Sequence, residues 1–360
     1  MALVVLCMSG AAVQAQSRTT SIQKGMNWLI TKQDQQNGSY TKYLPQPAGT
    51  AIVEIAFLDS PSKYMGPFVT NGYKYISTHV QSKGGLYMKK YGYYSYNTSL
   101  ALIAFLARGD KSDQGKVEAA RKYLINMQFN AEDGPITIEN QSVFGGWGYD
   151  FDTLAPDPDI ITTYWACEAL HRSGVKSDSN VWKDATVFIK RCTNEKFGGF
   201  KTAPEDSKSK LSATRRSSRI LRPYGSATCA GVAGLLLCGN KADDNKVMNG
   251  VKWIAENFEL HENPKLGHRE RFLYYYLLAR ALELNGSNEI SEPKGGESIP
   301  WAEKLSEYLI KIQKDNGSWE NDKAIREAEK NWCPEASREL TSAYALMALS
   351  ICERALVGKK

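Results

Sequence analysis

Apolar residues recur along this 360-residue chain in two alternating kinds of helix-length segment. The first kind has one apolar and one charged face, as in residues 302–311, A-E-K-L-S-E-Y-L-I-K. The second kind is apolar or small on nearly every side, as in residues 226–237, S-A-T-C-A-G-V-A-G-L-L-L. A helix with one apolar stripe suits a surface, whereas a helix that is apolar all round is packed on both sides. The alternation predicts an all-α fold with outer and inner helices.

The two kinds of segment form six pairs, and aromatic turns containing glycine join the members of most pairs. Repeated helix pairs stack on their neighbours, and a set of six can close into a ring that buries its terminal repeats against each other. We therefore predict a closed α6/α6 toroid, with an open solenoid as the alternative. The predicted inner helices are 50–58, 97–107, 159–171, 226–238, 269–284 and 340–352.

The most complete unit runs from Phe144 to Leu170. A glycine-rich aromatic turn is followed by the acidic approach P-D-P-D, which ends at Asp159. Aspartate is a preferred N-cap, and the two prolines cannot extend a helix backwards. We expect a helix to begin at about Asp159, whose carboxylate should accept a backbone N–H near Ile161 or Thr162.

Four units carry a glutamine ahead of the turn, namely Gln33, Gln81, Gln128 and Gln313, and three of these units match a longer pattern. Their sequences are K24-G-x2-W-L-I-x2-Q33-x4-G38-x-Y40, Y308-L-I-x2-Q313-x3-G317-x-W319, and residues 120–128 with G146-W147. These motifs resemble the QW repeats of squalene-hopene cyclases and of the wider terpene cyclase and protein prenyltransferase family, which includes prenyltransferase and squalene oxidase repeat proteins. The resemblance covers essentially all of residues 16–360 and implies an α/α toroid with a central cavity. Thr193 and Phe258 replace the glutamine in two units.

In a closed ring, the turns bring the N-termini of the inner helices, with their positive dipole ends, to one mouth. Aromatic side chains there, with a few polar groups, suit an extended apolar ligand or a carbocation. The alternative is that the aromatic residues pack the turns and the polar residues cap the helices. The predicted cavity and ligand-binding residues are Tyr94, Tyr96, Trp147, Tyr149, Trp165, Tyr224, His268, Arg269, Tyr275, Arg338 and Ser342.

The acidic approach is similar to the Asp-x-Asp-Asp-Thr motif with which squalene-hopene-like cyclases protonate their substrate. By that resemblance Asp159 is the general acid and Asp157 its neighbour, but Ile160 replaces the third acid and the threonine is displaced to Thr162. A general acid needs a raised pKa, whereas a carboxylate that caps a helix is stabilised as the anion. Asp157 and Asp159 are the predicted catalytic residues, and the capping role of Asp159 is the alternative.

The family's protein prenyltransferases hold zinc with Asp, Cys and His. The four histidines here are His79, His171, His261 and His268, and no Asp-x-Cys lies beside an inner helix, so we expect neither a metal nor another cofactor. The Gly-Cys-Gly-Glu-Gln run of complement-type thioester proteins is also missing from the sequence.

Residues 2–13 are almost wholly apolar, and V13-Q-A15 would permit cleavage after Ala15. We therefore expect a signal peptide at residues 1–15 and a secreted or periplasmic protein. The segment is too short to span a bilayer, so we expect no transmembrane helix. The other six cysteines form no regular framework, and four of them lie in apolar helical runs, which favours buried free thiols.

The 45 basic and 39 acidic residues give a net charge of +6 that is spread along the chain, so nucleic acid is not implied as a partner. We expect a single domain over residues 16–360. A basic, serine-rich insertion at 201–222 is predicted to be a flexible loop, or alternatively a mobile lid or an anionic-ligand contact.

Two functions from different classes follow. The first is a binding toroid that holds a hydrophobic small molecule or an extended partner segment and has lost its acid, as Ile160 and the missing second helical domain of full squalene cyclases suggest. The second is a class II cyclase, an isomerase that uses Asp159. We favour the first.

Overall fold

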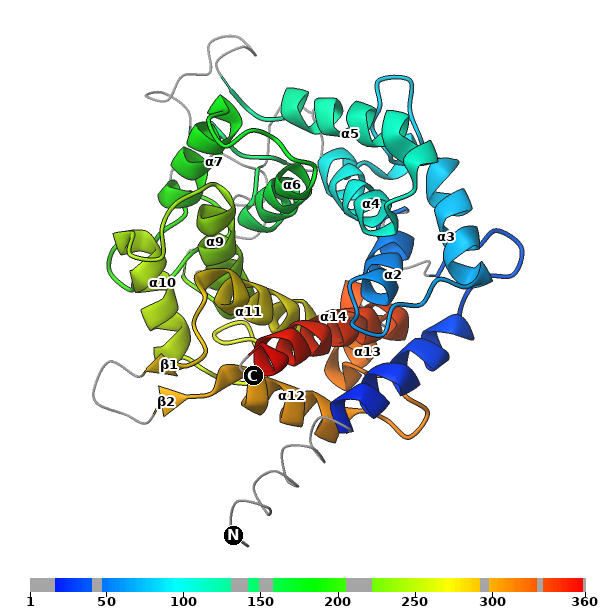
Figure 1. Ribbon diagram of the computed structural model, residues 1–360. Helices are drawn as coiled ribbons and strands as arrows, with labels where there is room; N and C mark the ends of the chain where they lie inside the picture. Colours follow the sequence, from blue (N-terminus) through cyan, green and yellow to red (C-terminus); the bar gives the residue numbers. More distant parts are fainter. Residues whose placement is uncertain are drawn as a thin grey trace, which may run out of the picture.

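The computed structural model describes residues 17–40, 47–130, 142–148, 158–204, 222–291, 298–328 and 333–358. Six of its helices surround a common axis (Figure 1). Each of them packs on the next along the chain, and the last packs on the first, so the ring is closed as predicted. These inner helices are α2 (Ala48–Leu58), α4 (Tyr94–Arg108), α6 (Ile160–Arg172), α9 (Gly225–Leu237), α11 (Arg271–Asn285) and α14 (Arg338–Val357).

A second ring of helices covers the first (Figure 1). It consists of the helix over residues 17–30, α3 (Pro67–Ser77), α5 (Gln114–Asn126), α7 (Asn180–Arg191), α10 (Asn245–Glu256) and α12 (Trp301–Ile312). The outer helices bury one face, whereas every residue of α2 and all but one residue of α9 are buried. The two segment types of the sequence therefore take the two positions that their apolar surfaces require.

The remaining elements are small and peripheral. A short helix α13 (Asp322–Ala328) precedes α14, and two-residue strands β1 (Ile290–Ser291) and β2 (Ser298–Ile299) pair antiparallel between α11 and α12. Short 3-10 turns are η1 (Lys89–Tyr91), η2 (Lys111–Asp113) and η4 (Pro334–Ala336).

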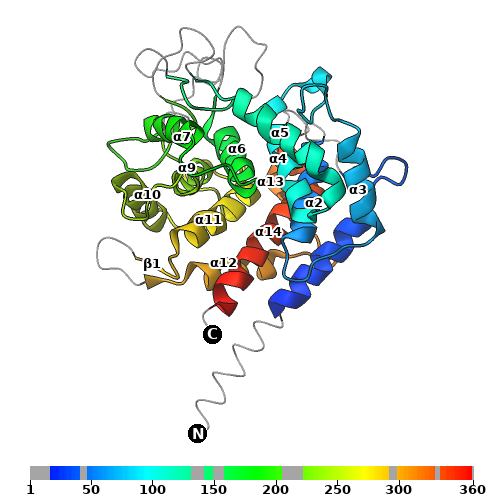
Figure 2. The same ribbon diagram turned by 45° about the horizontal axis from the view of Figure 1, so that its top comes forward.

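The first and last repeats join directly, which closes the outer ring (Figure 2). Arg18 forms an ion pair of 2.5 Å with Glu353 near the end of α14, and both side chains are largely buried. Ser21 donates a 2.6 Å hydrogen bond to the amide oxygen of Gln313. Terminal repeats joined in this way need no separate capping repeat.

In three of the turns, a glutamine amide makes the same pair of hydrogen bonds. The amide of Gln33 donates to the carbonyl of Gly38 in its own turn, at 3.0 Å, and to that of Phe68 in the next outer helix, at 2.7 Å. The same amide therefore holds its own turn and ties one repeat to the next. Equivalent pairs join Gln128 to Gly145 and Val181, and Gln313 to Gly317 and Ser21.

A second repeated contact fastens five of the six turns to the inner helix that follows. The backbone N–H of Trp147 donates to the hydroxyl of Thr163 at 3.1 Å, and the N–H of Trp319 donates to that of Ser342 at 3.0 Å. The same contact joins Tyr40 to Thr50, Leu86 to Thr98, and Phe200 to Thr228. A hydroxyl in the first turns of an inner helix is therefore a repeat signal in addition to the glutamine and the glycine.

Candidate functional site

The mouth of the ring is the end at which the inner helices begin, and Asp159 lies there as the N-cap of α6. Its Oδ1 accepts the backbone N–H groups of Ile161 and Thr162 at 2.9 and 3.0 Å, and its Oδ2 accepts the Thr162 hydroxyl at 2.6 Å. The side chain is 3% exposed. The capping geometry expected from the sequence is confirmed. The three accepted hydrogen bonds favour the ionised carboxylate, and burial opposes it.

The start of the basic insertion packs against this cap, which corrects the expectation of a flexible loop over its first four residues. Lys201 and Thr202 are buried, and the carbonyl of Thr202 accepts the N–H of Ile160 at 2.8 Å. Burial raises the pKa of the Cys192 thiol. The charge of Lys201 lowers this pKa and the charge of Asp159 raises it, so both side chains lie near Cys192. Residues 205–221 of the insertion lie outside the described residues.

Tyr96, in the first turn of α4, reaches into the ring below the mouth. Its hydroxyl is 3.5 Å from that of Tyr344 on α14, and α2 separates these two helices in the ring, so the contact lies inside it. Burial raises the pKa of Tyr96 to about 12, and the charges of Asp159 and Glu270 add to the rise. The ring of Tyr96 is nevertheless only half-buried. It is therefore the predicted aromatic residue best placed to meet a ligand that enters the mouth.

Below Tyr96, a layer of aromatic side chains crosses the interior. Trp165 of α6 stacks on Tyr276 of α11, with ring centroids 5.3 Å apart and planes 5° apart. Tyr276 in turn stacks on Tyr344, and its hydroxyl is 2.9 Å from that of Tyr164. The indole N–H of Trp165 is buried and has no hydrogen-bond partner among the described residues.

An ion-pair layer lies beneath the aromatic layer. Glu168 is fully buried and bonds to Arg172 at 2.7 Å and to Arg280 at 3.1 Å. Burial alone would raise the pKa of Glu168, but Arg280 and Arg172 outweigh it and hold the pKa below its usual value. Arg172 also reaches Asp59 at 2.7 Å, and Arg280 reaches Glu283 at 2.8 Å. The aromatic layer and the ion-pair layer thus both contain contacts between inner helices that are not neighbours in the ring, and both layers lie in its interior.

Carboxylates also mark the rim around α11. Glu270 precedes this helix with a left-handed backbone (φ 54°) and accepts the Ser226 hydroxyl at 2.7 Å. Glu335 accepts the backbone N–H groups of Arg271, Phe272 and Leu273 at 2.8 to 3.0 Å, and the Asn321 amide at 2.7 Å. Burial raises the pKa of Glu335 to about 7 against these hydrogen bonds. No residue pattern in the sequence had indicated either carboxylate.

Four of the predicted ligand-binding residues lie in packing interfaces instead of on the axis. Tyr94 stacks on Tyr87 of the preceding turn, and Tyr275 contacts Tyr308 of α12 and donates to Leu260. Trp147 donates its indole N–H to Leu124 of α5, and Ser342 fastens the last turn. For these four residues, the packing and capping alternative describes the geometry.

Other predicted residues lie on the rim. Tyr224 is the residue before α9 and shares a 2.9 Å hydrogen bond with Thr202. His268 and Arg269 both contact Glu327 of α13, and Arg338 pairs with Glu320 at 3.0 Å. Tyr149 and Asp157 lie outside the described residues. The mouth therefore brings Tyr96, Asp159 and Tyr224 together with Lys201 and Glu270, which the site prediction did not include.

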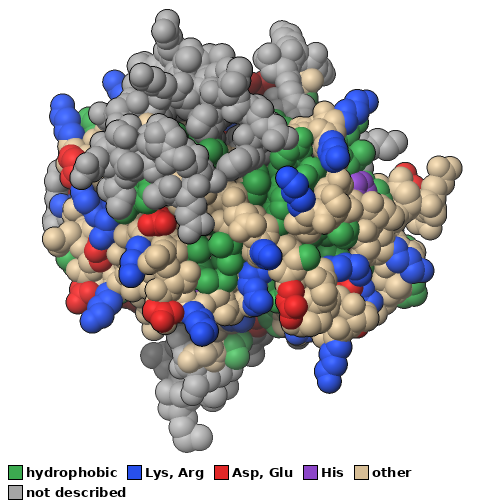
Figure 3. All heavy atoms as spheres, turned by 90° about the horizontal axis from the view of Figure 1, so that it is seen from above, with side chains coloured by type: hydrophobic (Ala, Val, Ile, Leu, Met, Phe, Trp, Pro, Cys, Tyr) green, Lys and Arg blue, Asp and Glu red, His purple; other side chains and the backbone are tan. Residues whose placement is uncertain are grey.

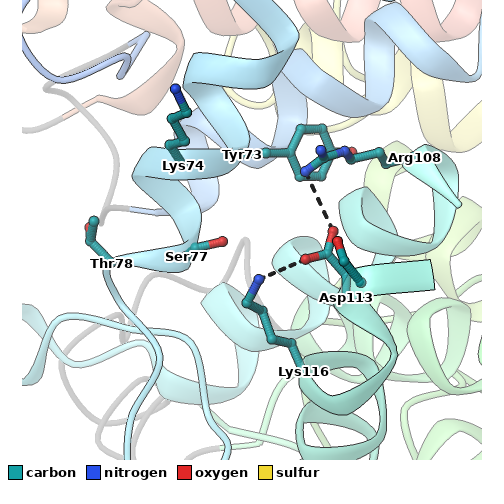
Figure 4. Close-up of a pocket in the computed structure, with 8 residues that line it drawn as sticks. Tyr73, Lys74, Ser77, Thr78, Arg108, Asp113 and Lys116 are labelled. Atoms are coloured by element: carbon teal, nitrogen blue, oxygen red, sulfur yellow. Dashed lines mark hydrogen bonds and ion pairs between the residues drawn. The ribbon is translucent and has the colours of Figure 1, made fainter. Parts of the chain in front are cut away.

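A pocket of about 410 Å³ lies at the periphery, between α3, the C-terminal end of α4 and the start of α5 (Figure 4). Asp113 pairs there with Lys116 at 2.6 Å and with Arg108 at 3.5 Å. The Arg108 guanidinium also lies over the ring of Tyr73, 4.9 Å from its centroid. These paired charges join outer and inner helices, and we interpret the pocket as a structural joint.

The surface shows no single-sign field on the face in Figure 3, where basic and acidic side chains are interspersed. Among the described residues, no group of three or more His, Cys, Asp or Glu side chains is arranged to hold a metal ion. Among the helices that the structure describes, α14 is the one that is long and apolar enough to cross a membrane. Of its apolar 18-residue stretch, 72% is buried inside the molecule.

Comparison with solved structures places this fold among α/α-toroid enzymes. The chain is similar to the type II terpene cyclase MstE from Scytonema, with a TM-score of 0.62 and 13% identity over 95% of this chain and 99% of that chain. A family 76 glycoside hydrolase from a bovine Bacteroides thetaiotaomicron strain has a TM-score of 0.60 and 11% identity, over 92% of this chain and 77% of that chain. No protein-family model and no curated protein matches the sequence.

A variant of MstE was also solved with geranylgeranyl dihydroxybenzoate as substrate, and it matches with a TM-score of 0.58 and 12% identity, over 96% of this chain and 99% of that chain. At these identities the likeness establishes the fold alone. The protein is therefore an α/α toroid with a terpene-cyclase-like fold.

Proposed function

We propose that this chain is a binding toroid, which holds an extended apolar ligand or an apolar partner segment in the aromatic mouth of the ring without protonating it. The observation that carries the proposal is the engagement of Asp159. Both carboxylate oxygens accept hydrogen bonds from the first turn of α6, and an anion stabilised in this way is a poor proton donor.

The aromatic layer supports a ligand that enters from the mouth. Tyr96 is only half-buried, and below it the stacked rings of Trp165 and Tyr276 provide an apolar floor. The indole N–H of Trp165, which has no partner among the described residues, is a donor that a polar end group of a ligand would satisfy, because a buried donor without an acceptor is costly. A prenylated small molecule has this combination of a long apolar chain and a polar end.

We further propose that the protein is exported, on the sequence of residues 1–15, which lie outside the described residues. A binding toroid outside the cytosol would carry or present an apolar molecule.

The binding proposal is tested with two tyrosines of α4. Native mass spectrometry of the full chain with geranylgeraniol should show a one-to-one complex. Tyr96→Ala should weaken it by about tenfold or more, as expected when an aromatic contact is lost from a buried site. Tyr94→Ala, which removes a ring that stacks on Tyr87 instead, is the matched control and should bind as the wild type does. Equal affinity of the two variants, or no complex at all, would contradict the proposal.

The alternative is a class II cyclase that uses Asp159 as its acid. One specific observation favours it: Asp159 is buried at the mouth, within electrostatic range of Tyr96 and above an aromatic layer that suits a carbocation. This function requires that Asp159 gives up the cap on binding substrate, and it predicts product formation that the binding function does not.

A further inference from the structure

Two cysteine thiols from neighbouring inner helices approach each other on the side of the ring away from the mouth. Cys167 lies on α6, and Cys238 directly follows α9 as its C-cap residue. Their Sγ atoms are 3.7 Å apart. A disulfide bond requires about 2.05 Å, so the two sulfurs need to approach by less than about 2 Å.

The two thiols differ in access. Cys167 is fully buried, whereas Cys238 is half-buried and lines a surface pocket of about 320 Å³. Trp182, Thr186 and Asn240 contribute to the same pocket. The pocket therefore gives a small molecule access to Cys238, whereas Cys167 is fully buried among the described residues.

We propose that Cys167 and Cys238 form a reversible disulfide by exchange with a small-molecule disulfide. The thiolate of Cys238 attacks one sulfur of the reagent, whose S–S bond breaks and releases one thiol. Cys167 then loses its proton to water and attacks the sulfur of Cys238, which displaces the second thiol. Two protein thiols are thus oxidised while one small disulfide is reduced to two thiols.

The environment of Cys167 fits the second role. The hydrogen bond to Cys238 and burial hold the pKa of the Cys167 thiol well above its usual range, so Cys167 remains protonated while the accessible thiol reacts. Because Cys167 is fully buried, its attack requires a local rearrangement and is slower than the first attack, so a mixed disulfide on Cys238 should accumulate before the internal bond forms.

The bond would join α6 to α9 around a loop that contains the outer helix α7 and the basic insertion at 201–222. Closing a loop of this length reduces the entropy of the unfolded chain, so the folded ring becomes more stable. An oxidising compartment, which an exported protein would meet, favours the bond. The inference is independent of the ligand in the mouth.

The experiment treats the full chain with oxidised glutathione, counts free thiols after denaturation, and maps cross-linked peptides by mass spectrometry. We expect the loss of two thiols, one cross-linked pair containing Cys167 and Cys238, and a Tm increase on the order of 5 °C that dithiothreitol reverses. Cys167→Ser should stop at a stable glutathione adduct on Cys238. Cys229→Ser is the matched control, because Cys229 lies buried on α9, and this variant should form the bond as the wild type does.

Two outcomes would overturn the inference. One is an unchanged thiol count at millimolar oxidised glutathione. The other is a cross-link that involves another cysteine, or one that persists in Cys238→Ser.

Discussion

The hydroxyl of Thr162 donates a 2.6 Å hydrogen bond to Oδ2 of Asp159, while Oδ1 of the same carboxylate accepts two backbone N–H groups. Asp159 therefore ends the chain's acidic approach as a structural cap. Its position at the mouth matches the resemblance to cyclases, but its hydrogen bonds match a helix N-terminus. Measurements of stability and of product formation in Asp159 variants distinguish the helix cap from the catalytic acid.

Substitution of Asp159 tests the cap. Asp159→Asn should lower the free energy of unfolding little, because asparagine caps about as well, whereas Asp159→Ala should lower it by about 1 to 2 kcal/mol. Chemical denaturation monitored by circular dichroism measures both. Equal losses in the two variants would show that charge, and not the cap, provides the stabilisation.

Glu168 should be one of the most sensitive polar positions. Glu168→Gln removes the charge that Arg172 and Arg280 share inside the ring, and breaking a buried pair costs about 3 kcal/mol or more. Glu195→Gln is the control, since Glu195 pairs with Lys246 on the surface and should change stability by less than about 1 kcal/mol. Similar small effects at both sites would contradict the assigned ion-pair layer.

Glu335 gives a pH dependence with a defined sign. Burial raises its pKa from 4.5 to about 7 in the folded state, so the folded protein binds more protons than the unfolded chain between these values. Its contribution to stability is present below pH 4.5 and is lost as the pH rises to about 7, by up to about 3 kcal/mol.

Unfolding at pH 5 and pH 8, compared between wild type and Glu335→Gln, isolates this contribution. The wild type should lose more stability over the interval than the variant, which has no titrating group at this position. Parallel pH profiles would mean that the four hydrogen bonds outweigh burial.

Gly317 tests ring closure. It has φ 93°, and an added Cβ would lie 2.4 Å from the carbonyl oxygen of Lys24 in the first repeat. Gly317→Ala should cost about 3 kcal/mol or more, from backbone strain and the clash together. Gly286→Ala, at φ 70° with open space around it, should cost only about 1 to 2 kcal/mol. Equal costs would indicate that the first and last repeats do not pack closely.

The sequence predicts the ring well, because its dominant signal is which helices are apolar on all sides. The start of α6 at Asp159 also follows from local capping chemistry. The rotation of an inner helix does not follow, because no polar face distinguishes its sides. Tyr275 and Tyr276 show the consequence: the first contacts α12 and the second reaches the interior, although they are adjacent in sequence.

The polar contacts inside the ring could not be predicted from the sequence either. Glu168 and Arg280 lie on helices that do not neighbour each other in the ring, and only closure brings them together. Lys201 belongs by composition to a basic loop, but its burial depends on how the segment meets the N-terminus of α6. Such contacts require tertiary structure that local patterns do not encode.

The most direct test of the central claim is an assay of wild-type protein and Asp159→Asn with geranylgeranyl substrates, in which bound and extracted material is analysed by mass spectrometry. The account predicts that both proteins bind the molecule one to one and release it unchanged. A cyclised product formed by the wild type and lost in Asp159→Asn would contradict it.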